Sequence, residues 1–505
     1  MTIKKDMYIE IPELHDRVVG AEDVASWIED GMTLGLSGFT RAGDAKAVPF
    51  ALIERAKKEP LSVNIFTGAS LGSDIDKMFA EVGLVNKRIP FQADRTMRQK
   101  INDGEMMFVD HHLGVMAEDI RSGVLGEIDY AVIEAIKITE DGKIIPTTSV
   151  GNSSNFVANA KKVVVEINQA HPEELEGVHD IYEPAEQGKR DPIPLTGAAD
   201  RIGESGISVD PEKIVGIVFT NYEDSPSTIL PPDEETDMIA EHLIKFLKKE
   251  VEAGRLTNEL APLQAGIGTV ANAVLYGLLE TDFENLEVYS EVLQDAVFDL
   301  IDEGKVTHAS ACSMTLSEEK MKKVFNNFDD YKDKLVLRPQ EISNHVEIIR
   351  RLGIISINTA LEVDIYGNVN STHVGGSNMM NGIGGSGDFA RNARLAIFVT
   401  KSLAKGGDIS SIVPFVSHVD HTEHDVDVIV TEQGYADIRG LAPVERAQVI
   451  IENCIHPEYK EQMLEYFNMA RLRGGHTPHV LEEAFSWHVN LAQNGTMLKK
   501  RSHKV

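Results

Sequence analysis

The chain has few cysteines, few tryptophans and no long apolar run. Its two cysteines, Cys312 and Cys454, are too few for a disulfide framework, which favours a reducing compartment. No stretch of about 20 apolar residues is present that would span a bilayer. Residues 1–10 lack the apolar core of a signal peptide. We therefore expect a cytoplasmic protein that does not enter a membrane.

Basic residues are also scarce relative to acidic ones. The 505 residues include 49 Lys and Arg against 80 Asp and Glu, a net charge of −31. So acidic a chain is a poor binder of nucleic acid or of anionic lipid, and an anionic substrate would need a local positive patch. The content of 42% apolar and 26% charged residues is that of a globular protein. The length predicts two to three domains.

Short apolar runs rich in β-branched residues alternate with amphipathic segments. Residues 238–253 carry apolar side chains at helical spacing, and Gly254 follows as a helix terminator. The runs predicted as strands are 61–66, 130–138, 162–167, 214–219, 395–400 and 426–431. This alternation predicts an α/β fold with a parallel or mixed sheet.

The two halves of the chain repeat a pattern. Residues 151–161 and 384–394 align at an offset of 233, and each segment precedes an apolar run. A proline-rich acidic stretch, residues 221–237, reads as a linker between them. We infer two similar open α/β domains in tandem, residues 1–224 and 225–505. Because ligand sites favour domain interfaces, we expect the active site where the two domains face each other.

Two glycine loops point to the chemistry. Residues 381–387 contain glycine at positions 382, 384, 385 and 387, so bare backbone can approach a phosphate or an oxyanion there. The loop Gly266-Ile267-Gly268-Thr269-Val270 leads into a predicted helix, whose N-terminus attracts anions. It lacks the Rossmann pattern, and the chain has no P-loop motif. A tight strand-to-helix turn would explain the loop equally well.

Glu291 stands near the end of the predicted strand 286–292, ahead of a helix from Asp295. Reactive groups in open α/β sheets lie at such strand ends. Spacing alone does not separate a reactive carboxylate from a solvated one.

Five segments together resemble class I coenzyme A transferases, in the acetyl-CoA hydrolase/transferase branch. They are the Gly266 loop, Tyr289-Ser290-Glu291, and residues 339–344, 364–371 and 381–392. The resemblance implies that Glu291 is the nucleophile and that Asn344 and the Gly385 N–H stabilise an oxyanion. It further implies that coenzyme A contacts Gly266, Ile267, Gly268, Thr269, Val270, Asn381 and Lys405. Residues 38–46 resemble the loop on the carboxylate side.

The implied function is transfer of CoA between a short-chain acyl-CoA and a small carboxylate such as acetate. The donor would be succinyl-CoA, propionyl-CoA or acetyl-CoA, and the reaction would pass through a glutamyl-CoA thioester with ping-pong kinetics. Coenzyme A is then a substrate, no cofactor or metal is expected, and the family suggests a homodimer. Acyl-CoA hydrolysis at the same site is the alternative, and a non-catalytic acyl-CoA sensor is a third.

Other motifs compete with this interpretation. Gly68-Ala69-Ser70-Leu71-Gly72 matches the G-x-S-x-G pattern of serine esterases, although no His-Gly-Gly motif precedes it. The segment 418–425 is rich in His and Asp, yet its spacing fits no standard structural zinc pattern, which favours a hydrogen-bonded loop. Arg41 or Lys46 is a candidate to neutralise a small acid, and a surface salt bridge is the alternative. Arg95 and Arg98 are further candidates.

Overall fold

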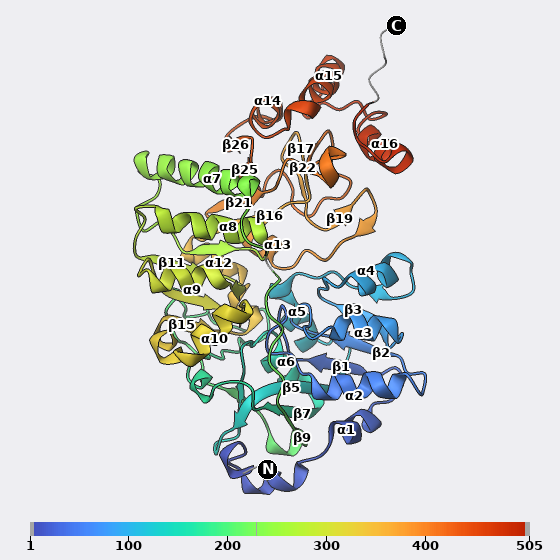
Figure 1. Ribbon diagram of the computed structural model, residues 1–505, viewed down its shortest axis with the longest axis vertical. Helices are drawn as coiled ribbons and strands as arrows, with labels where there is room; N and C mark the ends of the chain where they lie inside the picture. The colour runs from blue at the N-terminus through green and yellow to red at the C-terminus, as the bar shows by residue number, and fades with distance from the viewer. Residues whose placement is uncertain (1–4, 229, 500–505) are drawn as a thin grey trace. The chain divides into compact units, whose positions relative to one another are not determined.

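The computed structural model describes residues 5–228 and 230–499, and the chain divides into two compact units (Figure 1). Unit 1 comprises Met1–Thr228, Glu287–Ile301 and Val306–Leu352, and unit 2 comprises Ile229–Leu286, Asp302–Lys305 and Gly353–Val505. The two units group residues that lie close together in space, so each unit combines segments from different parts of the sequence. The predicted pair of related domains with a boundary at residues 224 and 225 stays a prediction.

Unit 1 is built on a nine-stranded sheet. Its order is β4-β3-β2-β1-β5-β6-β8, with β7 paired to β5 and β9 paired to β7. All pairs are parallel except β5–β6 and β6–β8. The strands are β1 (Thr33–Leu36), β2 (Val63–Phe66), β3 (Val85–Ile89), β4 (Met107–Phe108), β5 (Ile128–Ile138), β6 (Lys143–Pro146), β7 (Ala160–Asn168), β8 (Ile207–Ser208) and β9 (Ile214–Thr220).

Helices and a further group of strands complete unit 1. Strand β11 (Leu286–Tyr289) lies next to β13 (Val306–Ala311) in the sheet order. Parallel pairs join β13 to β15 (Leu335–Leu337) and β12 (Val292–Leu293) to β14 (Ser313–Met314). The helices are α1 (Ala21–Trp27), α2 (Ala47–Ala56), α3 (Ile75–Glu81), α4 (Arg95–Asn102), α5 (Leu113–Arg121), α6 (Ser153–Asn159), α9 (Asp295–Asp302), α10 (Glu318–Asn326), α11 (Gln340–Ser343) and α12 (Val346–Leu352).

Unit 2 has its own run of strands in the order β10-β16-β21-β25-β26. These are β10 (Leu263–Ala265), β16 (Ile355–Thr359), β21 (Leu395–Val399), β25 (Val428–Thr431) and β26 (Gly434–Asp437), parallel except for the last pair. Short pairs lie outside it: β17 (Glu362–Asp364) with β18 (Val369–Asn370) and β24 (Ile412–Val413), β19 (His373–Val374) with β20 (Asn378–Met379), and β22 (Leu403–Ala404) with β23 (Ile409–Ser410). The helices are α7 (Glu234–Glu252), α8 (Thr269–Gly277), α13 (Ser386–Asn392), α14 (Pro443–Asn453), α15 (Pro457–Arg473) and α16 (Ser486–Asn494).

The predicted internal repeat is present in the secondary structure. Helices α6 and α13 are displaced by 233 positions at both ends, and the strands β7 and β21 follow them. Each half also has its hairpin, β5–β6 around Gly142 and β17–β18 around Gly367. The predicted helix 238–253 is confirmed by α7, after which Gly254 takes φ 70°.

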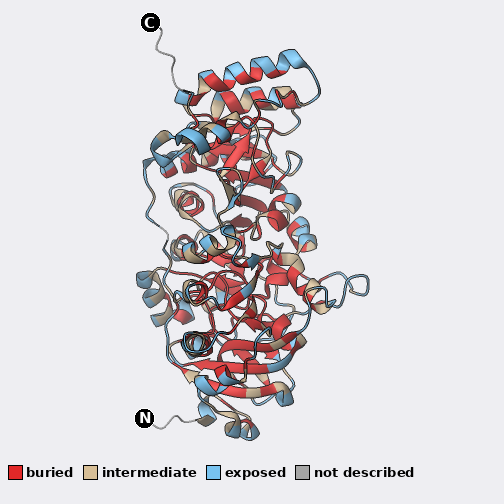
Figure 2. Ribbon diagram, turned by 90° about the vertical axis from the view of Figure 1, so that its right-hand side faces the viewer, coloured by how far each residue is buried: buried red, intermediate tan, exposed pale blue. Residues whose placement is uncertain are grey.

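The predicted linker is shorter than expected at its C-terminal end. Helix α7 begins at Glu234, because Asp233 accepts a hydrogen bond from the Thr236 N–H at 3.0 Å and the Thr236 hydroxyl accepts one from the Asp233 N–H. Most positions in the strands are buried, and the helices expose one face (Figure 2). Within residues 5–228 and 230–499, no helix combines the length and apolarity needed to cross a membrane.

Candidate active site

Glu291 sits in the link between β11 and β12, where its backbone is firmly held. Its carbonyl oxygen accepts hydrogen bonds from the N–H groups of Cys312 at 3.0 Å and Ser313 at 3.1 Å. The residue is only 8% exposed. The predicted nucleophile is therefore a largely buried carboxylate on a fixed main chain, not a solvated side chain.

Asn344 lies beside this carboxylate. It caps the short helix α11, and its Nδ2 donates a hydrogen bond to Glu291 Oε1 at 3.0 Å. The Tyr289 hydroxyl, two residues before the carboxylate, donates to the Ile342 carbonyl at 2.7 Å. Strand β11 and helix α11 are thus joined two residues before each member of the Glu291–Asn344 pair. The structure brings these two predicted residues together, although they stand 53 positions apart.

Helix α11 is also anchored to α5. The Gln340 amide donates to the Leu113 carbonyl at 3.0 Å, and the Arg121 guanidinium pairs with Glu341 at 2.7 Å. Burial raises the pKa of Glu341, and Arg121 opposes that shift. These contacts fix the direction from which Asn344 approaches the carboxylate.

An apolar cluster lies next to Glu291. It consists of Phe39, Ala69, Leu113, Val292 and Cys312, with Phe91 packed against it. Burial raises the pKa of Cys312 well above its usual value, so this thiol stays protonated and is a poor nucleophile. The surroundings of Glu291 on this side are apolar and unreactive.

The loop that supplies Phe39 has a strained backbone. Thr40 and Arg41 take φ values of 51° and 70°, in the left-handed region that non-glycine residues rarely adopt. Two contacts hold them there: the Thr315 hydroxyl donates to the Thr40 carbonyl at 2.6 Å, and the Arg41 N–H donates to the Ser70 carbonyl at 3.2 Å. The predicted role of this loop toward a carboxylate substrate stays a prediction.

Lys46 is not available to a substrate, so that candidate role was wrong. Its side chain is fully buried, and its ammonium donates to Glu134 at 2.7 Å, to Asp224 at 3.0 Å and to the Asp44 carbonyl at 2.8 Å. Although burial alone would lower the pKa of Lys46, the neighbouring carboxylates raise it well above the usual value. Lys46 is a permanent internal cation.

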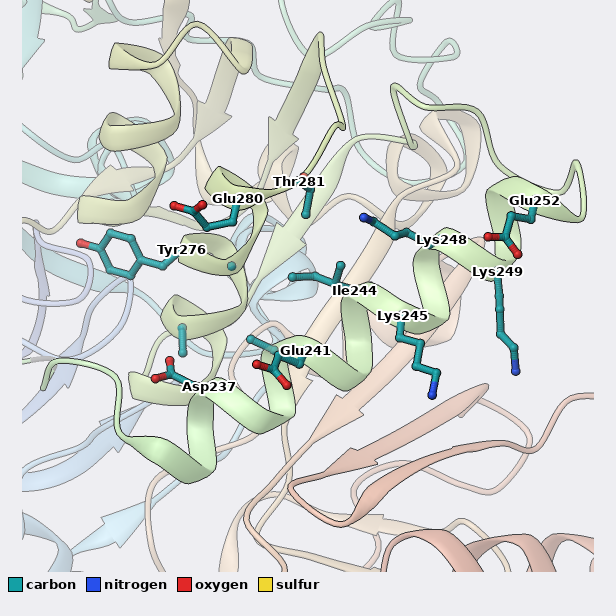
Figure 3. A pocket seen from close by; sticks show the side chains of 13 residues that line it. Asp237, Glu241, Ile244, Lys245, Lys248, Lys249, Glu252, Tyr276, Glu280 and Thr281 are labelled. Atoms are coloured by element: carbon teal, nitrogen blue, oxygen red, sulfur yellow. The ribbon is translucent and has the colours of Figure 1, made fainter.

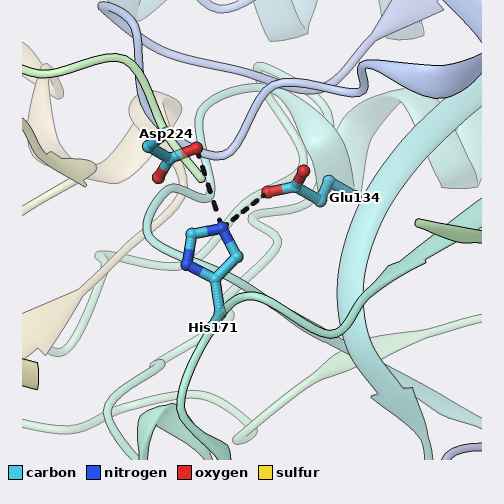
Figure 4. Close-up of side chains that lie close together, drawn as sticks. All are labelled: Glu134, His171 and Asp224. Atoms are coloured by element: carbon cyan, nitrogen blue, oxygen red, sulfur yellow. Dashed lines mark ion pairs between the residues drawn. The ribbon is translucent and has the colours of Figure 1, made fainter. Parts of the chain in front are cut away.

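Near Lys46, three side chains lie close enough together to hold a metal ion (Figure 4). Ligand atoms of Glu134, His171 and Asp224 all lie within 4.8 Å of one another, and His171 Nε2 is 3.2 Å from Glu134 Oε1. The Lys46 ammonium already supplies the cation to both carboxylates. Burial raises the pKa of Glu134, but Lys46 and His171 outweigh it and bring the value to about 2. The group is a buried ionic cluster in which Lys46 pairs with both carboxylates.

In unit 2, the Gly266 loop follows the end of β10. The Gly266 N–H donates to the Ile357 carbonyl at 2.8 Å, and paired amides of Gln264 and Asn358 bond at 3.1 and 3.2 Å beneath it. Gly268 takes φ 137° and precedes the first turn of α8. Ile267 is exposed, and Thr269 and Val270 are half-buried. The loop is the expected glycine turn into a helix N-terminus, and its role toward coenzyme A stays a prediction.

The second glycine loop turns into α13. Gly384 takes φ 57°, and Gly385 is the N-cap residue, its carbonyl accepting from the Phe389 N–H at 3.0 Å. Asn381 Oδ1 is buried, and no described residue donates a hydrogen bond to it. Lys405 lies apart, on an exposed turn with φ 48° after β22. The predicted contacts of Asn381 and Lys405 with coenzyme A stay predictions, and the exposed Lys405 is equally compatible with a solvated side chain.

The competing motifs find no support. Ser70 lies in an irregular stretch between β2 and α3, not at a sharp strand-to-helix turn, and no described histidine hydrogen-bonds to its hydroxyl. His418 is paired with Asp420 at 3.2 Å, and His421 Nε2 lies 3.0 Å from the Ser386 hydroxyl. This segment is the hydrogen-bonded loop that its spacing favoured.

A pocket that the sequence analysis did not predict lies between α7 and α8 (Figure 3). It has a volume of about 820 Å³, an apolar floor that includes Ile244 and Gly277, and a charged rim. Two rim lysines are engaged elsewhere: Lys248 with Asp282 at 3.4 Å and Lys249 with the Tyr435 hydroxyl at 2.7 Å. None of the predicted site residues lines it.

The sequence has known relatives along nearly its whole length. Family models described as the acetyl-CoA hydrolase/transferase N-terminal domain and C-terminal domain match residues 4–219 and 321–467. The chain is 53% identical to a succinyl-CoA:acetate CoA-transferase of Clostridium kluyveri, covering 96% of this chain and 91% of the relative. It is 44% identical to an acetyl-CoA hydrolase of Candida albicans, covering 94% of this chain and 94% of the relative.

A solved structure shares the fold. RipA from Yersinia pestis superposes with a TM-score of 0.71 at 22% sequence identity, covering 90% of this chain and 98% of that one. At this level of identity the likeness concerns the fold alone.

Proposed function

Because the chain belongs to the acetyl-CoA hydrolase/transferase family, we propose that it is a CoA-transferase that moves CoA between a short-chain acyl-CoA and a small carboxylate such as acetate. The proposed CoA donors are succinyl-CoA, propionyl-CoA and acetyl-CoA. The observation that carries the proposal is the buried Glu291 carboxylate with the Asn344 amide 3.0 Å away. That arrangement places a hydrogen-bond donor, the Asn344 amide, next to an oxygen atom of the nucleophile, the Glu291 carboxylate.

The carboxylate would act in two half-reactions. Glu291 attacks the acyl-CoA carbonyl, the C–S bond breaks, and a mixed anhydride and CoA thiolate form. The thiolate then attacks the glutamyl carbonyl and expels the donor carboxylate, which leaves a glutamyl-CoA thioester. An incoming acetate attacks this thioester to give an acetyl-glutamyl anhydride, and the thiolate closes the cycle by taking the acetyl group. No proton, cofactor or metal is consumed.

Asn344 is suited to the steps at the glutamyl carbonyl. Attack there turns a Glu291 oxygen into an oxyanion, and the Asn344 Nδ2 already donates to Oε1 of that group. Preorganised donors aimed at a developing negative charge give the largest single contribution in many enzymes. We assign the Gly385 N–H as a second donor. We assign Gly266 to Val270, Asn381 and Lys405 to the coenzyme A path.

Hydrolysis is the second candidate, since the Candida albicans relative is named an acetyl-CoA hydrolase. Water would then replace acetate as the acceptor. The burial of Glu291 and the apolar cluster of Phe39, Ala69 and Val292 beside it favour transfer, because they limit water at the carbonyl. A sensor without activity would have no use for a buried, amide-paired carboxylate.

Three broader features belong to the proposal. Coenzyme A is a substrate and no cofactor is needed, because the chemistry requires only carboxylates and a thiolate. We place the enzyme in the cytoplasm, since both cysteines are free and buried. We propose a homodimer, which sedimentation of the purified protein at several concentrations tests directly.

The function is tested by steady-state assays with acyl-CoA in the presence and absence of acetate. A transferase forms acetyl-CoA from succinyl-CoA only with acetate present and shows parallel-line, ping-pong kinetics. Release of free CoA at the same rate without acetate would make the enzyme a hydrolase. Binding of CoA with neither product would leave only the sensor.

A further inference from the structure

Asp420 and His421 stand in the loop before β25, where the main chain is tightly fixed. The His421 N–H donates to the Val369 carbonyl at 3.0 Å, and the Val369 N–H donates to the His421 carbonyl at 2.8 Å. The imidazole is buried, with its centroid 4.7 Å from that of Phe398. The position of the His421 ring is therefore set by strand β18 on one side and by β21 on the other.

This ring reaches the glycine loop that contains Gly385. His421 Nε2 lies 3.0 Å from the Ser386 hydroxyl oxygen, and that hydroxyl donates to the Ile383 carbonyl at 2.8 Å. The Ser386 hydroxyl proton is directed at Ile383, so the contact with His421 is a hydrogen bond in the tautomer that carries hydrogen on Nε2. The same Nε2 lies 3.5 Å from the Ser371 hydroxyl oxygen. The result is a brace across the turn formed by residues 383–386.

Asp420 holds the other end of the same loop. Its carboxylate accepts from the Ser371 N–H at 2.6 Å and from the Thr372 hydroxyl at 2.9 Å. The Thr372 carbonyl in turn accepts from the Met380 N–H at 2.7 Å, immediately before Asn381. Two adjacent residues thus secure both ends of the segment 381–386.

Such a brace matters because the segment 381–386 is rich in glycine. Its glycines offer no side chains to pack, and Gly384 takes a left-handed φ of 57°. No described residue accepts a hydrogen bond from the Gly385 N–H, so that donor remains available to a ligand. A donor stabilises an oxyanion only while it is held at the right place, and a misplacement of about 1 Å can cost about 10²-fold in rate.

We propose that Asp420 and His421 are positioning residues that fix the turn carrying the Gly385 N–H, the donor assigned above to the oxyanion, with His421 acting through Ser386. The inference rests on the proposed function, in which Gly385 is an oxyanion donor. Neither residue touches the reacting atoms in this assignment, and both act by fixing the loop that does.

The test compares two substitutions at one position. His421→Leu introduces an apolar side chain of similar bulk and removes the Nε2–H donor. His421→Gln keeps an N–H donor near the place of Nε2. We expect His421→Leu to lower kcat for CoA transfer by about 10²-fold with KM for acyl-CoA within about threefold of wild type, and His421→Gln to recover most of the loss. Ser386→Ala, at a half-buried position, should lower kcat similarly, and adding His421→Leu to it should cost little more.

The outcomes separate this inference from the function it rests on. If wild-type enzyme forms no thioester at Glu291, the proposed function itself fails. If the thioester forms and His421→Leu and Ser386→Ala both keep wild-type kcat, the function stands and the positioning role is refuted. Losses that are additive in the double variant, or that His421→Gln does not repair while the unfolding midpoint falls, would assign His421 to stability alone and also refute the proposal.

Discussion

Replacing Asn344 by alanine tests whether the amide beside Glu291 works in catalysis or only in the resting enzyme. The Nδ2 to Oε1 distance is 3.0 Å, and both residues are buried. A hydrogen bond to a charged group contributes about 1.5–3 kcal/mol to a ground state. An oxyanion donor contributes about 2.7–4 kcal/mol to a transition state, which is about 10²–10³-fold in kcat.

We expect Asn344→Ala to lower kcat and kcat/KM together by about 10²–10³-fold with KM unchanged, because the interaction strengthens as the oxyanion forms. The assay is succinyl-CoA:acetate exchange followed at saturating acetate. An unfolding midpoint measured on the same variant separates loss of structure from loss of rate. A kcat within about threefold of wild type would refute the assignment of Asn344 as an oxyanion donor.

Asn344→Asp is the matched control, since it keeps the shape of the side chain and reverses its electrostatics. A second carboxylate next to Glu291 disfavours ionisation of the pair, so the pKa of the nucleophile rises. The active form of Glu291 is then present only at higher pH. The residual activity of Asn344→Asp should therefore increase with pH across a range where wild type is flat.

Four further substitutions test the supporting structure. Lys46→Met should lower the free energy of unfolding in urea by about 3–5 kcal/mol, because it leaves buried carboxylates without their cation; a loss below about 1 kcal/mol would contradict the ionic cluster. Glu134 has its pKa lowered to about 2, so its stabilisation of about 3 kcal/mol is present above pH 4.5 and lost as pH falls toward 2; Glu134→Gln should flatten the acid-unfolding curve there, and an unchanged slope would count against it. Gly38→Ala should destabilise unit 1, since Gly38 takes φ 126° and a Cβ would lie 2.6 Å from Asp44 Cβ; wild-type stability in a thermal melt would contradict the close approach. Tyr289→Phe should cost about 1 kcal/mol and reduce kcat, and full activity would show that α11 does not need this hydrogen bond.

The repeated pattern made the architecture readable from the sequence. Residues 153–159 and 386–392 both form helices, and the apolar runs that follow them form parallel strands, as expected for a repeated pattern. Local periodicity sufficed because strand and helix signals depend on neighbouring residues. The linker end was misplaced, because the capping pair of Asp233 and Thr236 starts α7 inside the acidic stretch.

The site was less accessible to sequence reasoning. Spacing does not bring Asn344 next to Glu291, because that contact depends on how β13 and β15 carry the chain back; only the family resemblance linked them. Lys46 was misjudged for the same reason, since its partners Glu134 and Asp224 come from distant segments. A signal was nevertheless present: Glu134 interrupts a long apolar strand, and a charged residue there indicates a buried ion pair.

The most direct test of the central claim is to trap the covalent intermediate on Glu291. The protein is incubated with succinyl-CoA without acceptor, treated with borohydride, digested and mapped by mass spectrometry. We predict that the reduced residue, with the carboxylate converted to an alcohol, is at position 291, and that Glu291→Ala shows none while still binding CoA. Modification at Ser70 instead, or full exchange activity in Glu291→Ala, would contradict the mechanism.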